Sequence, residues 1–529
     1  EVESSNMLDP YDNTLIGFNL SGPIWRNKAT RAPILGFRFS GRYTSFADDD
    51  PPAIDVYSVK PDVLAELEAN PIVNIGGTPF VAADFLNAGD AQALNYRPNE
   101  GGSLLDLTAK IDARISPAVD MTFTGAFRGS ENQFTPGGWR LMNSHNNPIA
   151  SGNTFRGNFR FRHRFGMNED GRQKKTGLIQ NAGYTLQAGY ELSESNSSDS
   201  RLGENYFDYG YIGKFDIAWV PTFVETFDPA TGQFYLVHTD YREILRGYTA
   251  GDRNPVRANF NNAMGIDFAS GEPLNGNIGD YLITNLQGAT PGISRTSFYA
   301  QNGTISSVFT NSWNFHSNVG SIYGAVARSK SEILSFNGNL SFDLVPGSSD
   351  KSRHSIEIGF MYEERLSRSY NVFPVTLWDV ARQQVNNHIL GIGENRDTVA
   401  LLDYENYPQT ALYGLSIAEG ADNLFYKRIR EALGVPLDQF VNVDGLDPDQ
   451  LRLDMFSAKE LNDQGILSYF GYDYLGNEFD GTFDDFFTAE VDGVRTFPVA
   501  PNRPTYTAVY LQDKFTFRDI IFRLGLRVD

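Results

Sequence analysis

Alternation of apolar and polar residues with a period of two, kept over unusually long segments, constrains this chain more than any other feature. From Leu105 to Ile115 every odd position is apolar and every even position is polar or charged. After Ser116–Ala118 the alternation resumes at Val119 and continues through Phe127. A period of two is typical of β-strands with two different faces. The pattern therefore predicts a hairpin of strands of about ten residues or more, where ordinary strands have about five or six.

The same alternation recurs along most of the chain. It covers 35–43, 155–165, 182–192, 334–344, 356–362, 505–517 and 520–529. We count about a dozen strands or slightly more by this template. A Gly- and aromatic-rich composition, with 50 Gly and 13% Phe, Trp and Tyr, agrees with a β-rich rather than a helical chain.

The connections between these segments alternate between short and long. The short ones are 25–33, 116–118, 166–178, 345–353 and 518–519, and the long ones are 45–102, 130–153, 193–208, about 249–302 and 371–504. Loops longer than about 15 residues are uncommon in compact soluble domains. Short turns at one end and long loops at the other are typical of an outer-membrane β-barrel. The expected fold is thus all-β: part of an antiparallel transmembrane β-barrel, with long extracellular loops that carry short helices.

Alternation alone does not say which face is buried. In a soluble sandwich the apolar face points inward, whereas in a membrane barrel it meets lipid and the polar face meets a wet or plugged lumen. Strand length and the asymmetry of the loops favour the barrel. No run of about 18 apolar residues exists, which excludes a transmembrane helix.

Charge and cysteine content exclude several functions. The chain has 529 residues, 44 Lys and Arg, 65 Asp and Glu, and a formal net charge of −21, which argues against a nucleic-acid binder. The absence of cysteine removes disulfides, zinc–thiolate sites, iron–sulfur clusters and thiol nucleophiles. No signal peptide begins at Glu1, and 522–529 still alternates like a strand in progress. We therefore interpret residues 1–529 as part of a longer barrel.

The largest insertion, 371–504, is the expected carrier of specificity. Helix-like patterns run from Pro374 to Val385 and from Asp422 to Leu433, and Asp447-Pro448 has the N-cap and first-turn residues of a third helix. A loop with its own helices is folded. Its function is then either an extracellular lid or docking surface for a substrate or lipoprotein, or simple packing over the barrel mouth.

Three acidic clusters suggest calcium, because carboxylate oxygens suit this ion. They are Asp48-Asp49-Asp50; Asp444, Asp447 and Asp449; and Asp480, Asp484 and Asp485. None has the spacing of an EF-hand loop. Solvated acidic surface is the favoured interpretation and calcium the alternative.

An arginine row on the polar face of 155–165 has two interpretations. Arg156, Arg160, Arg162 and Arg164 either attract anionic cargo or pair with acids such as Asp106, Asp112 and Glu191, or with a plug. We favour pairing.

Aromatic residues expected at strand ends have two interpretations as well, an interfacial belt or a sugar site, and we favour the belt. They are Tyr43, Phe165, Tyr190, Trp219 and Tyr362.

Catalytic signals are weak. The histidines lack H-E-x-x-H spacing, and no G-x-S-x-G, P-loop or G-x-G-x-x-G occurs. The histidines are His145, His163, His238, His316, His354 and His388. Of these, His163 lies on the apolar face of its strand near a turn. The sequence predicts no enzyme and no catalytic, cofactor-binding or metal site, and it leaves the substrate-binding residues unknown.

Three segments spread over the chain resemble TonB-dependent outer-membrane transporters of Bacteroidetes type. They are Leu8–Asn13 with Gly17–Ile24; Gly203-Glu204-Asn205-Tyr206-Phe207-Asp208-Tyr209-Gly210-Tyr211-Ile212-Gly213-Lys214-Phe215; and Tyr510–Phe515 with Leu524–Asp529. The resemblance covers the barrel of that family and does not identify a substrate. It implies a 22-stranded barrel with an N-terminal plug that this chain lacks, energised by TonB–ExbB–ExbD. It also implies a strand that ends within Glu1–Ser5 and short turns that face the periplasm.

The resemblance implies import of a nutrient, such as a glycan, peptide or metal chelate, across the outer membrane. Outer-membrane lipid and a surface lipoprotein lid would be further partners. Two alternatives stay open. One is an outer-membrane scaffold that docks surface lipoproteins or secretion partners, and the other is a soluble secreted polysaccharide-binding β protein.

Overall fold

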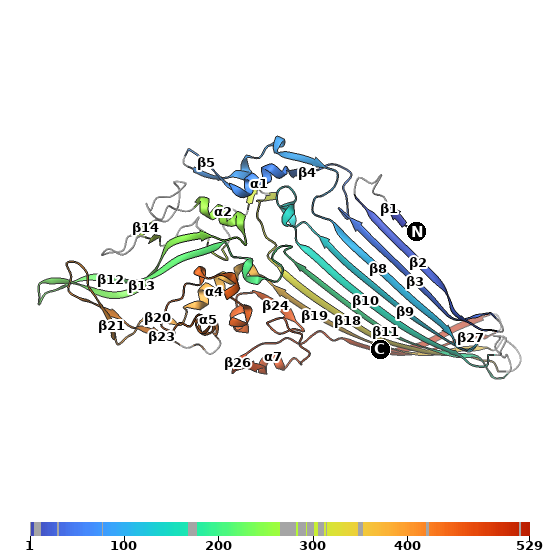
Figure 1. The fold of residues 1–529 in the computed structure, drawn as a ribbon. Helices are drawn as coiled ribbons and strands as arrows, with labels where there is room; N and C mark the ends of the chain where they lie inside the picture. The colour runs from blue at the N-terminus through green and yellow to red at the C-terminus, as the bar shows by residue number, and fades with distance from the viewer. Residues whose placement is uncertain are drawn as a thin grey trace.

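Twelve strands form one antiparallel sheet that dominates the fold. The computed structural model describes residues 2–4, 12–28, 31–76, 78–167, 177–264, 282–283, 292–293, 301–304, 311–313, 315–346, 353–418, 420, 423–517 and 520–529. The sheet follows the chain from strand to strand. Its order is β1 (Val2–Ser4), β2 (Thr14–Arg26), β3 (Pro33–Phe46), β8 (Gly102–Arg114), β9 (Val119–Gln133), β10 (Ile149–Arg164), β11 (Ile179–Ser198), β18 (Val326–Leu344), β19 (His354–Val372), β27 (Thr505–Phe517) and β28 (Ile520–Val528), with β24 (Leu467–Phe470) paired to one end of β19. Figure 1 shows these strands side by side, with the helices and small sheets gathered at one of their ends.

The strands expected from alternation are confirmed, and most are longer than expected. The hairpin β8–β9 has the register that the pattern requires, with Leu107 opposite Phe127 and Ile111 opposite Phe123. Its turn is closed by the Ser116 hydroxyl, which accepts hydrogen bonds from the backbone N–H groups of Ala118 at 3.2 Å and Val119 at 3.1 Å. The implied strand within Glu1–Ser5 is present as β1, which pairs with β2. The expected turn at Arg518-Asp519 and the segment Leu8–Tyr11 lie outside the described residues.

The two ends of the sheet differ as expected, with one correction. Short connections join β2 to β3, β8 to β9, β10 to β11, β18 to β19 and β27 to β28, and long segments leave the opposite end. The sequence interpretation separated 193–208 and 249–302 as two loops. In the structure β11 pairs directly with β18, so that 199–325 is one insertion and its described strands belong to two other sheets. The sequence interpretation left 209–248 between those two loops without assigning strands within it to a separate sheet.

The insertions at the long-loop end are folded, and we call their described residues the cap (47–101, 134–148, 199–325 and 373–504). The first holds β4 (Val56–Val59), α1 (Pro61–Ala69), β5 (Ile72–Ile75), β6 (Thr78–Val81) and β7 (Ala91–Leu94). The third holds β12 (Gly213–Asp228), β13 (Gln233–Ala250), α2 (Pro255–Met264), β14 (Leu282–Ile283), β15 (Gly292–Ile293), β16 (Asn311–Trp313) and β17 (His316–Ser317). The last holds α4 (Leu377–Val385), β20 (Ile389–Ile392), β21 (Thr398–Leu402), β22 (Thr410–Tyr413), β23 (Leu415–Ile417), α5 (Phe425–Leu433), α6 (Ala458–Asn462), β24, α7 (Asp485–Thr488), β25 (Glu490–Val491) and β26 (Val494–Arg495).

Two of the three predicted helices are confirmed. α4 occupies most of Pro374–Val385, after a 3₁₀ turn at Pro374–Thr376, and it buries Leu377, Val380 and Ala381 as expected. α5 begins at Phe425 and ends in a left-handed Gly434. The third prediction is wrong in length: Asp447 does form a capping box with Gln450, but only a 3₁₀ turn at Pro448–Gln450 follows. No described helix is both long and apolar enough to cross a membrane.

The hydrophobic core lies in the cap and not in the sheet. Its largest cluster joins 199–325 to 373–504 through fully buried side chains, among them Tyr209, Trp378, Phe425 and Phe456. A second cluster joins 47–101 to 134–148 and 199–325, with Val59, Leu67, Met142, Phe260 and Val319. The main sheet contributes only the cap-side ends of β18 and β19, and Leu467 of β24, to these clusters.

Candidate functional site

One face of the main sheet is a continuous apolar surface. Because apolar positions lie opposite one another in each register, the alternating side chains of all the long strands share this face. Many of its large side chains are between 38% and 68% exposed, namely Phe18, Leu20, Phe39, Tyr43, Ile111, Phe123, Phe155, Phe159, Leu186, Tyr190, Leu334, Phe336, Leu340, Ile358, Phe360, Val509, Leu511, Phe522, Leu524, Leu526 and Val528. We call this surface the apolar band.

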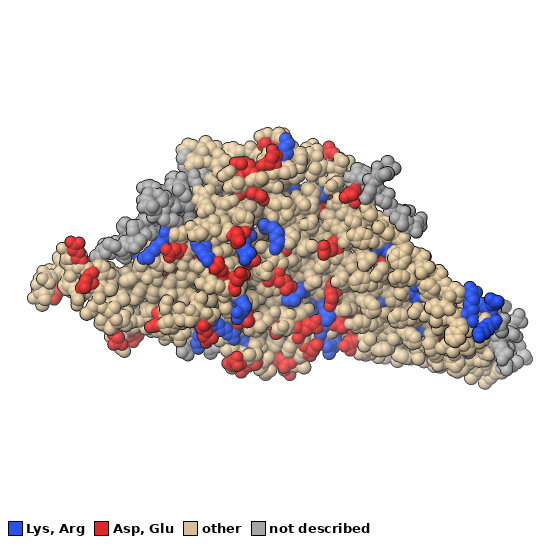
Figure 2. Space-filling view, viewed as in Figure 1, with Lys and Arg blue, Asp and Glu red and all other residues tan. Residues whose placement is uncertain are grey.

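No second layer of the described structure covers the apolar band. None of its residues belongs to a core cluster. Figure 2 shows a largely uncharged area over the long strands, between the charged side chains of the cap and a group of Lys and Arg at the short-turn tip. An exposed apolar area of this extent is rare on a soluble monomer and is typical of a protein–protein or membrane interaction surface.

Aromatic side chains stand at both ends of the apolar band. At the short-turn end Phe165 lies 4.6 Å from the His163 ring and 5.8 Å from the Tyr184 ring, between centroids. Toward the cap, the Tyr190 hydroxyl donates to Glu332 at 3.0 Å and the Tyr362 hydroxyl to Glu364 at 2.8 Å. Tyr43 also lies near the cap end of its strand.

The prediction for Trp219 is wrong. This residue lies in β12, outside the main sheet, and its ring stacks on Tyr241 at 4.0 Å and Phe440 at 5.3 Å between centroids. It therefore packs within the cap.

Charged groups replace the apolar side chains where the same face meets the cap. The Lys330 ammonium lies 2.8 Å from Glu478, and the Arg368 guanidinium lies 3.1 Å from Glu332. Only 3% of the Arg368 side chain is exposed. The apolar band thus ends, on the side of the cap, at ion pairs that include the cap residue Glu478.

The opposite face of the sheet is polar, and most of the predicted arginine row is paired there. Arg156 donates two hydrogen bonds to Glu191, at 2.8 and 3.2 Å, as expected. Arg162 and Arg164 both contact Asp120, at 2.9 and 3.1 Å.

The other predicted partners of the row have different neighbours. Asp106 pairs with Arg128 at 2.9 Å and Asp112 with Lys110 at 2.9 Å. Arg160 donates to the Thr122 hydroxyl at 3.2 Å. The pairing interpretation is confirmed for three of the four arginines.

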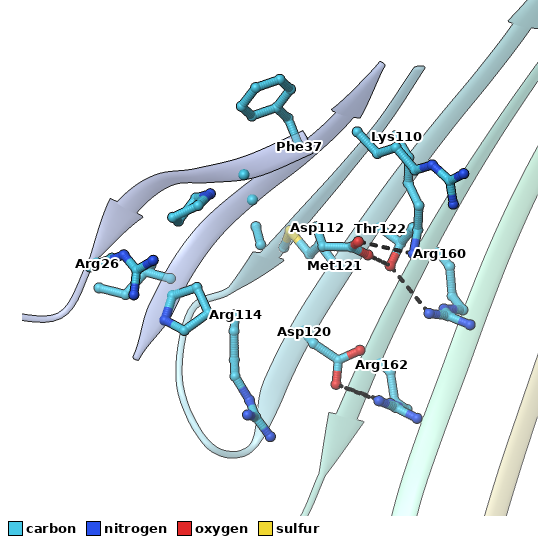
Figure 3. Close-up of a pocket in the computed structure, with 17 residues that line it drawn as sticks. Arg26, Phe37, Lys110, Asp112, Arg114, Asp120, Met121, Thr122, Arg160 and Arg162 are labelled. Atoms are coloured by element: carbon cyan, nitrogen blue, oxygen red, sulfur yellow. Dashed lines mark hydrogen bonds and ion pairs between the residues drawn. The ribbon is translucent and has the colours of Figure 1, made fainter. Parts of the chain in front are cut away.

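A hollow of about 560 Å³ lies on this polar face near the short turns. Figure 3 shows Arg114, Asp120, Arg160 and Arg162 around it, with the dashed contact from Asp120 to Arg162. The hollow is also lined by Arg26, Arg38, Lys110, Asp112 and Thr122. Its size is that of a small-ligand site, and its lining is cationic. Sequence analysis singled out Arg160 and Arg162 but missed Arg38 and Arg114, because only the register between strands brings these four together.

The first acidic cluster contacts an arginine. Carboxylate oxygens of Asp48, Asp49 and Glu100 lie within 4.8 Å of one another. The Arg97 guanidinium lies 3.2 Å from Glu100 and 3.7 Å from Asp48, and its backbone N–H donates to Asp48 at 2.8 Å. Asp50 contacts the same guanidinium at 3.5 Å. Arg97 therefore supplies a counter-ion to the cluster, and calcium there stays the alternative interpretation.

The second predicted cluster is separated by the fold. Asp444 is buried and takes two hydrogen bonds from Arg382, at 2.6 and 2.8 Å. Asp447 pairs with Lys214 at 2.8 Å, and Asp449 lies 3.8 Å from Arg253.

The third predicted cluster is separated as well. Asp480 contacts Arg368 and Arg503, whereas Asp485 accepts from the backbone N–H of Thr482 at 2.6 Å. Among the described residues, neither of these two clusters gathers three carboxylates at one point.

The histidines do not converge on a site. His145 pairs with Glu68 and His354 with Asp513, both at 2.7 Å. His238 is fully buried; its Nδ1 accepts from the Tyr413 backbone N–H at 3.1 Å, and its Nε2 lies 3.1 Å from the Asp240 carbonyl oxygen. Burial lowers the pKa of His238 and also that of His388, which stacks on Tyr426. Both imidazoles serve the packing of the cap.

No family model, curated protein or solved structure matches this chain.

Proposed function

We propose that the main sheet is part of the wall of an outer-membrane β-barrel, with the apolar band against lipid and the polar face toward the lumen. The uncovered apolar band carries this proposal. From Phe155 to Phe165 it extends about 34 Å along β10, or about 26 Å along the membrane normal at a tilt of about 40°. Outer-membrane barrels have an apolar belt of about 25 Å between two rows of aromatic residues. Phe165 and Tyr190 stand where those rows would be.

We further propose that this barrel is a TonB-dependent transporter that imports a nutrient. Two observations support this part. The first is the resemblance of Gly203–Phe215 and of Tyr510–Phe515 with Leu524–Asp529 to that family. The second is the folded cap, because an ordered structure over one end of a barrel is suited to recognising cargo before passage. In this proposal the cap is extracellular, the short turns face the periplasm, and TonB–ExbB–ExbD supplies the energy.

The uncovered apolar band argues against a soluble secreted protein, since a soluble sandwich would place a second layer on it. A scaffold that docks lipoproteins fits the same band and the same cap. It differs from a transporter only in whether cargo crosses the membrane.

Fractionation of cells that produce the protein tests the membrane proposal. We expect recovery in the outer membrane, dependence on detergent, and a faster-migrating band in SDS gels when the sample is not boiled. Recovery from the soluble fraction without detergent would exclude the barrel. Native mass spectrometry of the extracted protein then tests transport against scaffolding. A bound small ligand favours transport. A bound lipoprotein favours the scaffold if no small ligand is present and the protein's function does not depend on TonB.

A further inference from the structure

The polar face of the main sheet is cationic in a strongly acidic chain. Side chains that share this face include the cations Arg38, Arg42, Lys110, Arg114, Arg128, Arg156, Arg160, Arg162, Arg164, Arg365, Lys514, Arg523 and Arg527, and the anions Asp106, Asp112, Asp120, Glu191, Asp343, Glu357 and Glu363. The net charge of the whole chain is −21. Positive charge is thus concentrated on one surface, and such a surface attracts anions.

Like charges stand directly opposite each other at two places on this face. Arg38 is the cross-strand partner of Lys110, and Lys514 is the cross-strand partner of Arg523. Directly opposed like charges destabilise a sheet. An anion bound between them would relieve this repulsion, as Asp120 does between Arg162 and Arg164.

Arg38 and Arg114 on this face, like Lys514 and Arg523, have no partner within the described part of the chain. Arg38 and Arg114 are exposed, and neither makes an ion pair or side-chain hydrogen bond there, in contrast to Arg156, Arg162 and Arg164. Both line the hollow of Figure 3, where Arg114 is drawn with no dashed contact. Their guanidinium groups are available to a ligand.

A second hollow adjoins the first. It has a volume of about 400 Å³ and shares Arg160 and Arg162 with its neighbour. Its lining adds amides and hydroxyls, from Thr185, Gln187, Asn337, Asn339 and Tyr510, and one more cation, Arg527. Together the hollows offer guanidinium groups on one side and uncharged hydrogen-bonding groups on the other, which meet at the two shared arginines.

We propose that these two hollows bind an anionic oligosaccharide. Guanidinium groups pair with carboxylates or sulfates in a bidentate manner, and amides and hydroxyls suit the sugar hydroxyls between the charged groups. Concave hollows of this size favour a small ligand over the flatter surface of an acidic protein domain. The inference names a substrate class for the proposed transporter and rests on that function for its physiological role, whereas binding itself is measurable without transport.

Calorimetry on the detergent-purified full chain tests the proposal, with tetragalacturonate as the probe and maltotetraose as the neutral probe of equal length. We expect tetragalacturonate to bind, its affinity to fall with rising salt, and maltotetraose to bind at least about tenfold more weakly. Arg38→Gln and Arg114→Gln should each weaken tetragalacturonate binding about tenfold. Arg42→Gln is the matched control. It removes a cation on the same strand and face, outside both hollows, and should leave binding unchanged.

Equal binding of the two probes, or unchanged binding in both hollow variants, would overturn the proposal. So would cross-linking of Arg38 and Arg114 to an acidic polypeptide in protein extracted from native membranes, together with no binding of tetragalacturonate. Heat-modifiable migration in SDS gels, measured on every variant, separates loss of folding from loss of binding. Failure of the membrane proposal would appear as recovery without detergent, whether or not the probe binds.

Discussion

The Trp378 indole Nε1 donates a hydrogen bond to the Phe207 backbone carbonyl oxygen at 2.7 Å. Trp378 lies on α4 of the insertion 373–504, and Phe207 lies in the insertion 199–325. Their rings also meet edge to face, with centroids 6.0 Å apart. Two insertions that leave the sheet from different strands are therefore joined into one folded cap.

Trp378→Phe should weaken this junction. The variant leaves the Phe207 carbonyl unsatisfied in a buried site and opens a small cavity, for which we expect a loss of about 1–3 kcal/mol. Hydrogen exchange of cap amides measures the loss. Trp25→Phe is the control, because Trp25 is 63% exposed and outside the cap core. Equal exchange in the two variants would show that the bond is unimportant.

Arg382→Met should destabilise the cap more strongly. It leaves the Asp444 carboxylate, only 1% exposed, without its counter-ion, which costs about 3–5 kcal/mol. The double variant Arg382→Met with Asp444→Leu should recover much of the lost stability, because no buried charge is then left without a counter-ion. Lys459→Met breaks the exposed pair with Asp463 and should cost less than about 1 kcal/mol. Urea denaturation followed by cap fluorescence compares the three, and similar midpoints would contradict the expectation.

Gly210→Ala should disturb the same region for a steric reason. A Cβ at this position would lie 2.4 Å from the Val375 carbonyl oxygen and 3.0 Å from the Gly303 Cα. Because both contacts are backbone, relief requires movement of the chain, and we expect faster proteolysis of 199–325. Gly247→Ala is matched to it in the cap, since its nearest atom would be the Asp216 Cβ at 3.7 Å. Proteolysis as slow as in the wild type would refute the close approach.

Stability of the cap should fall as the pH drops below about 6.5. Burial lowers the pKa of His238 and His388, so the unfolded chain takes up protons between about 6.5 and the lower folded pKa while the cap does not. Buried carboxyls with a raised pKa, such as Glu460, change the stability of the cap in the opposite direction at pH values near that pKa.

His238→Asn isolates the imidazole, because the Asn oxygen can still accept from the Tyr413 N–H. In hydrogen exchange, the cap amides of the variant should lose less protection than those of the wild type when the pH falls from about 7.5 to about 5.5. An identical pH dependence in wild type and variant would exclude His238 as a source.

Phe159→Arg should impair insertion into lipid. Phe159 is 42% exposed within the apolar band, and an arginine at the centre of a lipid-facing barrel surface costs about 2–4 kcal/mol. Asn158→Arg adds the same charge one residue away on the polar face and should have little effect. Folding into liposomes, followed by migration of unboiled samples in SDS gels, measures the difference. A larger effect of Asn158→Arg would reverse the assignment of the two faces.

Sequence reasoning was most successful where the determinants are local. The alternation around Leu105–Phe127 predicted both strands and their turn, and the spacing of Leu377, Val380 and Ala381 predicted the buried side of α4. Pro61 at the start of α1 is a local signal of the same kind. Register follows from local pattern as well, since a shift by one residue would exchange the two faces.

Long-range partners were beyond the sequence. β12 and β13 are as long as strands of the main sheet but pair in another sheet. Asp444 pairs with Arg382 instead of joining an acidic cluster, and Trp219 packs on Phe440. Tertiary structure alone brought Arg38, Arg114 and Arg160 around one hollow. The physical reason is that a period of two depends on neighbours along the chain, whereas burial, ion pairing and sheet membership depend on which distant segments the folded chain brings into contact.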